Sequence, residues 1–361
     1  MPASAIDAIN PAFDHVRAQL LRRFRFGQWV RLAVVGVLAG EMGSSGSCNT
    51  NVNFPGGKFP WPVHPHSMPN TTNAFLPQQW MGHPVLFGSG IAILIAIGLA
   101  LLVLMIYVSS VMRFILFDSI VAKECHIRAG WVRRKVPGFR LFVWQILFMV
   151  TTWAAMLMLI GGPVAYAWAL GWFVHPGEHI LRLVLAGLAL FAVLFVVATG
   201  AVVIHVMTKD FVVPQMALED ISAFEGWRRL WLWLKHDASG YAGYIGMKIV
   251  LAIGASIAFA IVAGVALLII LIPMGGAGLV AVLSAKAAGW TWNFHTIALA
   301  VIIGVIALAI LLFVAAMISV PIVVFFPAYS FYFFAPRYAQ LAALLWPAPP
   351  SLPPPAPTAP G

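Results

Sequence analysis

The sequence predicts an all-α, polytopic integral membrane protein with about six transmembrane helices in three hairpins, joined by amphipathic helices at the cytoplasmic interface. Hydrophobic residues make up 62% of the 361 residues and charged residues only 9%, against roughly 45–50% and 25% in soluble domains. The apolar residues fall into runs long enough to cross a hydrocarbon core of about 30 Å. These two observations argue against a soluble globular protein.

Six apolar runs are the predicted spans. They cover residues 29–43, 85–112, 141–172, 180–207, 244–272 and 296–326 of a membrane domain at 29–345. The run at 29–43 is the shortest, and it falls short of the roughly 20 residues that an upright helix needs. We therefore expect this first span to be thin, tilted or partly inserted.

Three segments flank the spans. Residues 1–28 carry apolar side chains at helical spacing among arginines, which predicts a cytoplasmic amphipathic helix. Residues 44–84 are rich in proline, asparagine and glycine and form a predicted outer loop. Residues 346–361 contain PAPPSLPPPAPTAPG and predict a proline-rich cytoplasmic tail.

The distribution of basic residues sets the expected orientation. Of the 21 lysine and arginine residues, all but Lys58, Arg182 and Lys286 fall on the side that holds both termini. The positive-inside rule makes that side the cytoplasm, and we expect a multi-pass protein of a bacterial inner membrane. The positive charge then predicts anionic lipid headgroups as partners. Nucleic acid is not expected, because no recognition motif accompanies the charge.

The stretch from Pro214 to Lys235 is the most informative cytoplasmic segment. Its acidic residues precede its basic ones, an order that complements a helix macrodipole and predicts one interfacial helix. A similar Gly-Trp-basic pattern enters the third span, which indicates a repeat, although convergence at membrane borders explains it almost as well. The candidate headgroup-contacting residues are Trp131, Arg133, Arg134, Trp227, Arg228 and Arg229.

The pattern from Pro214 through Glu219 to the basic, aromatic segment at Trp227 resembles a known family. It is similar to the six-helix membrane domain attached to some bacterial glycerophosphodiester phosphodiesterases and to related stand-alone families of unknown function. The resemblance implies this architecture and an inner-membrane location. It carries over no catalytic residue, because the hydrophilic barrel domain that holds the phosphodiesterase chemistry is absent from this sequence.

Two features inside the spans are candidates for function. Glu41 lies near the end of the first span, and a carboxylate cannot reach far toward the interface. Gly161, Gly162 and Pro163 could form the broken helix of a substrate site, and a simple kink or a span end is the alternative.

Metal and cofactor sites are not predicted. A metal could be bound by His175, Glu178 and His179 together with His64 and His66, but Pro176 and Gly177 favour a turn between His175 and His179. Cys48 and Cys125 are expected on opposite sides of the membrane, and neither has the spacing of a zinc site.

The functional hypothesis follows from scarce buried charge and from missing catalytic motifs. We favour a non-enzymatic membrane protein that organises or senses the membrane or binds a partner, with another membrane protein as a candidate partner. A transporter or permease subunit for a small or lipid-like solute is the alternative, based on Glu41 and the Gly-Gly-Pro sequence. A lipid-modifying enzyme comes third, with its chemistry on these cytoplasmic carboxylates: Asp118, Glu124, Asp210, Glu219, Asp220, Glu225 and Asp237.

Overall fold

The computed structural model describes residues 4–22, 24–41, 84–174, 176–287, 289 and 294–346. Helices, and no strands, occur within these ranges, which confirms the all-α class. Outside the described residues lie the predicted outer loop at 44–84 except for residue 84, most of the tail at 346–361, Cys48, His64, His66 and His175.

The described elements follow one another in this order along the chain. Their bounds are α1 Ile9–Val16, a π-helical turn Arg17–Leu21, α2 Phe26–Leu38, α4 Pro84–Val121, α5 Ile127–Ala169, a 3₁₀ turn Pro176–Glu178, α6 Ile180–Met207, a second π-helical turn Thr208–Val212, α7 Val213–Glu219, α8 Ala223–His236, α9 Ala238–Ala287, α10 Phe294–Phe334, a 3₁₀ turn Ala335–Arg337 and α11 Ala339–Leu345.

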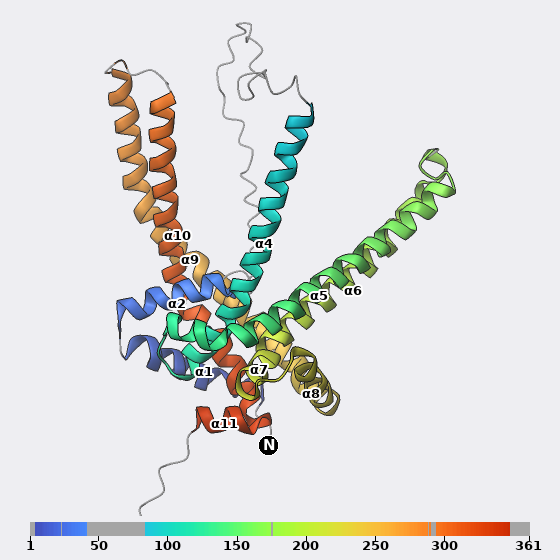
Figure 1. The fold of residues 1–361 in the computed structure, drawn as a ribbon, viewed down its shortest axis with the longest axis vertical. Coiled ribbons are helices and arrows are strands. Elements are labelled where there is room, and N and C mark those ends of the chain that lie inside the picture. The colour runs from blue at the N-terminus through green and yellow to red at the C-terminus, as the bar shows by residue number, and fades with distance from the viewer. Residues whose placement is uncertain are drawn as a thin grey trace, which may run out of the picture.

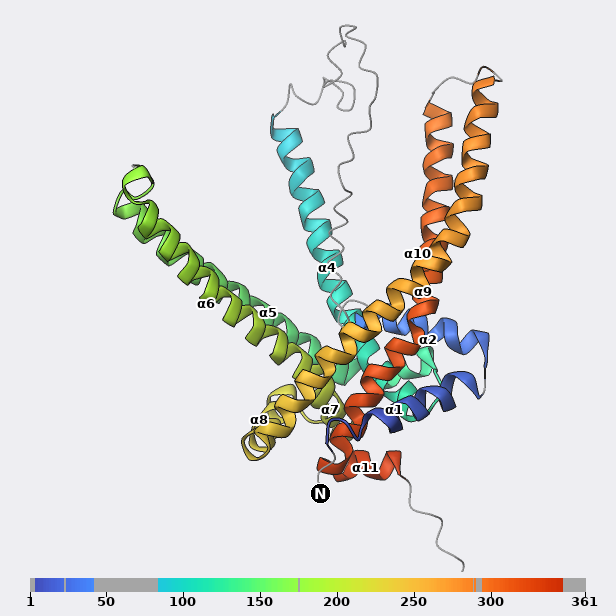
Figure 2. The ribbon, with the colours of Figure 1, turned by 180° about the vertical axis from the view of Figure 1, so that it is seen from behind.

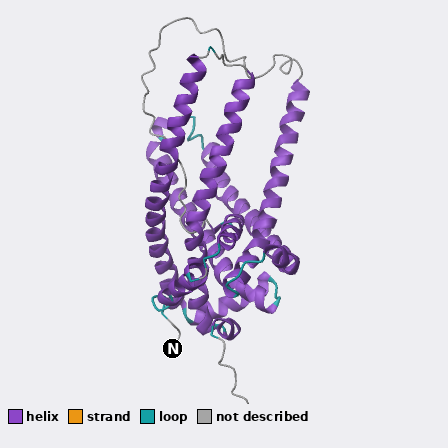
Figure 3. Ribbon diagram, turned by 90° about the vertical axis from the view of Figure 1, so that its left-hand side faces the viewer, coloured by secondary structure: helices purple, strands orange, loops and turns teal. Residues whose placement is uncertain are grey.

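Three arms diverge from one base. The first arm is α4, the second pairs α5 with α6, and the third pairs α9 with α10 (Figures 1 and 2). The base holds α1, α2, α7, α8 and α11 together with the near ends of the arms. Figure 3 shows the same division from the side, with the arms extending away from the base and the N-terminus.

Within the described residues, five helices are long and apolar enough to cross a membrane, one in each position of the predicted spans after the first. The predicted span at 29–43 differs. There the described helix is α2, with 13 residues from Phe26 to Leu38, a length of about 20 Å. It lies across the base (Figure 1), where Leu32, Ala33 and Val35 are buried. The helix stops because Gly40 turns the chain with a φ of +76°.

The long helices continue past their apolar runs into the base. Helix α5 starts at Ile127, well before the predicted span start at residue 141, and it passes through Pro137. It also runs through Gly161, Gly162 and Pro163 as one helix, so neither a broken helix nor a span end occurs at this point. Proline removes one backbone donor, and a transmembrane helix accommodates that loss by local adjustment.

The packed core lies in the base and not along the arms. Aromatic side chains fill it: the ring centroids of Phe211 and Tyr244 are 5.0 Å apart, and those of Tyr244 and Phe333 are 4.6 Å apart. By contrast, the most apolar window is 0% buried in four of the five long helices. Apolar surface left bare in this way suits hydrocarbon as its solvent.

The stretch at 214–235 forms two helices where the sequence predicts one. Helix α7 ends at Asp220, whose backbone adopts a left-handed conformation with a φ of +52°. Helix α8 then starts at the N-cap Ser222, whose Oγ accepts a hydrogen bond of 3.3 Å from the Glu225 amide. A serine three residues before a glutamate is a capping-box sequence, so the sequence carried a signal for this second start.

Helix α1 packs against α10 through its less apolar face. Ala12 and His15 are buried, whereas Phe13 is 58% exposed. The His15 ring holds two elements, because Nε2 lies 3.0 Å from the Ile120 carbonyl and Nδ1 lies 3.2 Å from the Tyr332 hydroxyl. One side of the Phe13 ring packs against the Phe325 ring of α10, with ring centroids 4.7 Å apart.

The close approach of α4 and α5 predicts a matched pair of outcomes. A Cβ on Gly138 would lie 3.0 Å from Val111 Cα, whereas Gly161 on the same helix has no neighbouring atom within 4 Å. We expect Gly138→Leu to lower stability by at least about 1–3 kcal/mol, the usual cost of overpacking. Gly161→Leu should leave it unchanged. Thermal unfolding in detergent, followed by tryptophan fluorescence, compares the two, and equal melting temperatures would contradict the packing described here.

His15 predicts a loss of stability in acid. Burial, and secondly the charge of Lys123, lowers the pKa of His15 below its ordinary value. In the unfolded chain, His15 takes up a proton as the pH falls through about 6.5, whereas in the folded protein it resists protonation. The stability that neutral His15 contributes is therefore present above this pH and is lost below it. Melting temperature should fall less for His15→Gln than for wild type between about pH 7.5 and 5.5. Parallel curves for the two proteins would refute this assignment.

Candidate functional site

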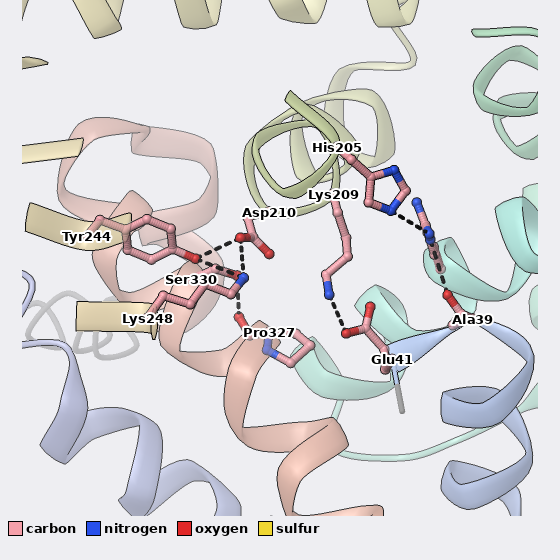
Figure 4. A network of polar contacts seen from close by, with 10 residues as sticks. Ala39, Glu41, His205, Lys209, Asp210, Tyr244, Lys248, Pro327 and Ser330 are labelled. Atoms are coloured by element: carbon pink, nitrogen blue, oxygen red, sulfur yellow. Dashed lines mark hydrogen bonds and ion pairs between the residues drawn. The ribbon is translucent and has the colours of Figure 1, made fainter. Parts of the chain in front are cut away.

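Ionisable side chains gather where the three arms meet the base. The junction network consists of Glu41, Arg113, His205, Lys209, Asp210, Tyr244 and Lys248 (Figure 4). They come from the segment after α2, from α4, from α6 and the π-helical turn that follows it, and from α9. Ionisable groups buried inside a membrane protein are costly, which makes the network the candidate functional site.

One ion pair connects the end of the first segment to the second arm. Lys209 Nζ lies 2.5 Å from Glu41 Oε2, and the two side chains are 8% and 3% exposed. Glu41 follows Gly40, whose positive φ turns the chain away from the direction of α2. The pair therefore fixes where the first segment meets the π-helical turn.

Arg113 connects the first arm to two neighbours. Its Nε donates to the Ala39 carbonyl at 3.2 Å, and its Nη2 lies 3.3 Å from His205 Nε2. The remaining Nη1 is buried and makes no hydrogen bond to the described residues. A buried guanidinium held on two sides fixes α4 relative to α6 and to the segment after α2.

A second ion pair connects the second arm to the third. Asp210 pairs with Lys248 and accepts a hydrogen bond of 2.8 Å from the Tyr244 hydroxyl. Tyr244 and Lys248 are one helical turn apart on α9, so both side chains reach the same carboxylate. On α10, Ser330 donates to the Pro327 carbonyl at 2.8 Å beside this pair (Figure 4).

The π-helical turn explains how two adjacent residues form ion pairs with partners on opposite sides of the turn. Lys209 and Asp210 both lie in the turn Thr208–Val212. Figure 4 shows Lys209 directed to Glu41 and Asp210 directed to Lys248. A π-helical turn widens the helix locally and often marks functional positions. Here it lets one turn contact both the first segment and the third arm.

The network is suited to holding charges in place. Its formal content is three cations and two carboxylates with His205 neutral, and the cavity it lines measures about 20 Å³. That space holds about one water molecule, whereas ligand pockets measure about 300–1,000 Å³. Among the described residues there is no group of three or more metal-ligating side chains.

The candidates predicted from the sequence separate into two groups in space. Glu41 belongs to the junction network. Gly161, Gly162 and Pro163 lie far along the second arm, where all three are exposed and both glycines have open space around them. The described structure therefore does not bring the Gly-Gly-Pro sequence to the charged site.

The first Gly-Trp-basic motif is built into the base. Arg134 pairs with both carboxylate oxygens of Asp118, at 2.9 and 2.6 Å, and donates to the Ala217 carbonyl at 2.7 Å. Trp131 packs edge-on against Tyr107 with ring centroids 6.1 Å apart. Arg133 also contacts Asp118, but its side chain is 67% exposed, so it reaches the solvent or headgroup side.

The second motif repeats this arrangement. Trp227 donates to Thr208 Oγ1 at 3.0 Å, and Arg229 pairs with Glu219 and Glu225. Arg228 is 76% exposed. The glycines match as well, since a Cβ on Gly130 would lie 3.1 Å from Ile115 and one on Gly226 would lie 2.8 Å from Val212. In each motif the glycine permits close packing.

Most of the junction network is not predicted from the sequence. Lys209 and Asp210 directly follow an apolar run, and Lys248 lies inside a predicted span. Both positions are signals, because ionisable residues at membrane depth tend to pair with one another. The sequence does not show which residues pair, since the partners are distant along the chain.

Replacing Glu41 tests the buried pair. Glu41→Gln removes the carboxylate charge beside Lys209, and we expect a loss of about 3–5 kcal/mol, as for other broken buried ion pairs. Glu124→Gln is the control, because its pair with Arg25 spans 3.8 Å with side chains 53% and 66% exposed. This control should change stability by no more than about 1 kcal/mol.

Thermal unfolding ranks these two variants, and the double variant Glu41→Gln/Lys209→Gln should recover part of the loss. Identical melting temperatures for the Glu41 and Glu124 variants would show that the buried pair does not stabilise the base.

Comparisons with known proteins give one match. No curated protein and no solved structure matches the chain, and nothing found links it to the glycerophosphodiester phosphodiesterases. One family model matches residues 3–344, nearly the whole chain. The chain therefore belongs to the family described as a family of unknown function (DUF7544).

Proposed function

We propose that this protein is a non-enzymatic membrane scaffold whose three arms hold the transmembrane helices of a partner protein. The observation that carries the proposal is the contrast between arms and base. The base is packed and ion-paired, whereas the most apolar window of every arm helix is at most 6% buried. A protein whose base fixes the directions of three arms can bind other helices on the exposed apolar surfaces of those arms.

The arm surfaces fit helix association in a bilayer. A Cβ added at Gly98, Gly187 or Gly264, each on a different arm helix, would have no atom within 4 Å apart from those of its own chain neighbours and the nearby backbone of its own helix. Helices in membranes associate through close van der Waals packing at small residues, because lipid removes the hydrophobic drive. The base holds the arms apart, and the small residues on them therefore favour the packing of partner helices between the arms.

The proposed location is a bacterial inner membrane with the base and both termini on the cytoplasmic side. The excess of basic residues in the base supports this orientation through the positive-inside rule. Arg133 and Arg228 are the exposed members of the two Gly-Trp-basic motifs. They would meet anionic headgroups at that surface, while Arg134 and Arg229 hold the base together.

A transporter or permease subunit is the second candidate. It is favoured by the buried charges of Glu41, Lys209, Asp210 and Lys248, because such groups often mark solute or ion pathways. The small cavity among them and the continuous helix at Gly161 argue for the scaffold instead, since transport sites form at broken helices.

The cytoplasmic carboxylates favour a structural role over chemistry. Each of the seven that the sequence offers has a basic partner within 4 Å. The pairs are Asp118 with Arg134, Glu124 with Arg25, Asp210 with Lys248, Glu219 with Arg229, Asp220 with Arg140, Glu225 with Arg228, and Asp237 with Arg337. Carboxylates paired in this way are spread over the base and not collected around one reacting centre.

Photo-crosslinking in the native membrane tests the scaffold. A benzophenone amino acid at Gly98, Gly187 or Gly264 should give adducts with one membrane protein, whose mass identifies it as another chain or a second copy. The same group at Arg228, exposed on the base, is the control and should not give that adduct. Lipid adducts alone at all three arm positions would overturn the scaffold, and a small solute retained in native mass spectrometry would favour transport.

A further inference from the structure

A basic groove crosses the outside of the base, away from the junction network. It lies between the turn that joins α1 to α2 and the turn that joins α4 to α5, and it measures about 470 Å³. The side chains that line it include Gln19, Arg22, Arg25, Gln28, Lys123 and Glu124. This volume falls within the range of small-molecule sites.

The charge in the groove is strongly one-sided. Arg22, Arg25 and Lys123 face one carboxylate, Glu124, which approaches Arg25 no closer than 3.8 Å. A neighbouring hollow shares Arg25, Gln28 and the same Glu124 with the groove, and it adds the cation Arg31. Guanidinium and ammonium groups gathered with so little compensation attract an anion with several acceptor oxygens.

The groove is also built rigidly. Gln28 Nε2 donates to the Lys123 carbonyl at 2.8 Å, and Gln19 Nε2 donates to the Ser119 carbonyl at 3.0 Å. Arg31 Nη1 donates to the Cys125 carbonyl at 3.3 Å. These bonds join α2 to the turn after α4, and the π-helical turn after α1 to the last part of α4, so the two walls of the groove keep their separation.

Lys123 adopts an unfavourable backbone conformation at the edge of this groove. Its φ is +57°, a left-handed conformation in which glycine is the usual residue after a helix end. A lysine at this position lacks the freedom of glycine to adopt a positive φ without strain, but it places a cation in the groove with the two arginines. Strain of this kind tends to occur at ligand-binding positions.

From the cations, the rigid walls and the strained lysine, we infer that the basic groove binds a phosphate group, with Arg22, Arg25 and Lys123 as its ligands. The same chemistry is offered by the headgroup of an anionic phospholipid and by a soluble phosphorylated polyol. Leu21, Phe24 and Phe26, beside the groove, are 65%, 64% and 60% exposed. Apolar side chains at this position would enter a bilayer and bring the groove to headgroup level, which favours the lipid. This site is independent of the proposed scaffold function.

Native mass spectrometry of the full-length protein with phosphatidylglycerol or phosphatidylcholine tests the inference. The variant Arg22→Gln/Lys123→Gly should fold, because glycine relieves the positive φ. The control Arg17→Gln/Lys235→Gln removes the same two charges from exposed positions outside the groove. We expect one tightly held phosphatidylglycerol, with affinity at least about tenfold lower in the groove variant and unchanged in the control.

Glycerol 3-phosphate and inorganic phosphate distinguish the two sources. Lipid that survives an excess of either assigns the groove to a lipid headgroup, whereas displacement that depends on Arg22 and Lys123 assigns it to a soluble phosphate compound. Equal binding of every probe by the groove variant and the control variant would overturn the site.

Discussion

Two buried ion pairs on one π-helical turn hold this structure together. Lys209 pairs with Glu41 on one side, and Asp210 pairs with Lys248 on the other. Removing charges from water is costly, and an ion pair offsets that cost when its geometry is good and its remaining hydrogen bonds are made. The Tyr244 hydroxyl supplies one such bond to Asp210. Because each partner comes from a different segment, the pairs set how the arms join the base.

The division between base and arms follows from the two solvents that such a chain meets. In the base, aromatic side chains pack around Phe211 and are buried as in the core of a soluble protein. Salt bridges of the Gly-Trp-basic motifs connect its helices. Along the arms, apolar side chains gain little by leaving lipid, so the helices can diverge without losing hydrophobic stabilisation. The same physics leaves the arm surfaces available to other helices.

Hydropathy predicts five of the long helices well, because the bilayer imposes their length and composition. Its signal is weakest at residues 29–43, where Gly40 ends a short helix that lies across the base. Gly161 to Pro163 do not end α5, which continues through them as the predicted span at 141–172 does. Glu41 is found from its depth alone, whereas its partner Lys209 is not, because pairing between distant residues leaves no local pattern. The helix start at Ser222 was present in the sequence as a capping signal.

The central claim is that the junction network fixes the directions of the arms. Pulsed electron paramagnetic resonance in nanodiscs measures this directly, with spin labels at Leu99, Leu188 and Leu283, which are exposed on α4, α6 and α9, in a chain whose native cysteines are replaced by serine. We expect narrow distance distributions between arms, which broaden with Glu41→Gln/Asp210→Asn and stay narrow with Glu124→Gln. Distributions as broad in the unmodified network as in that double variant would contradict the claim.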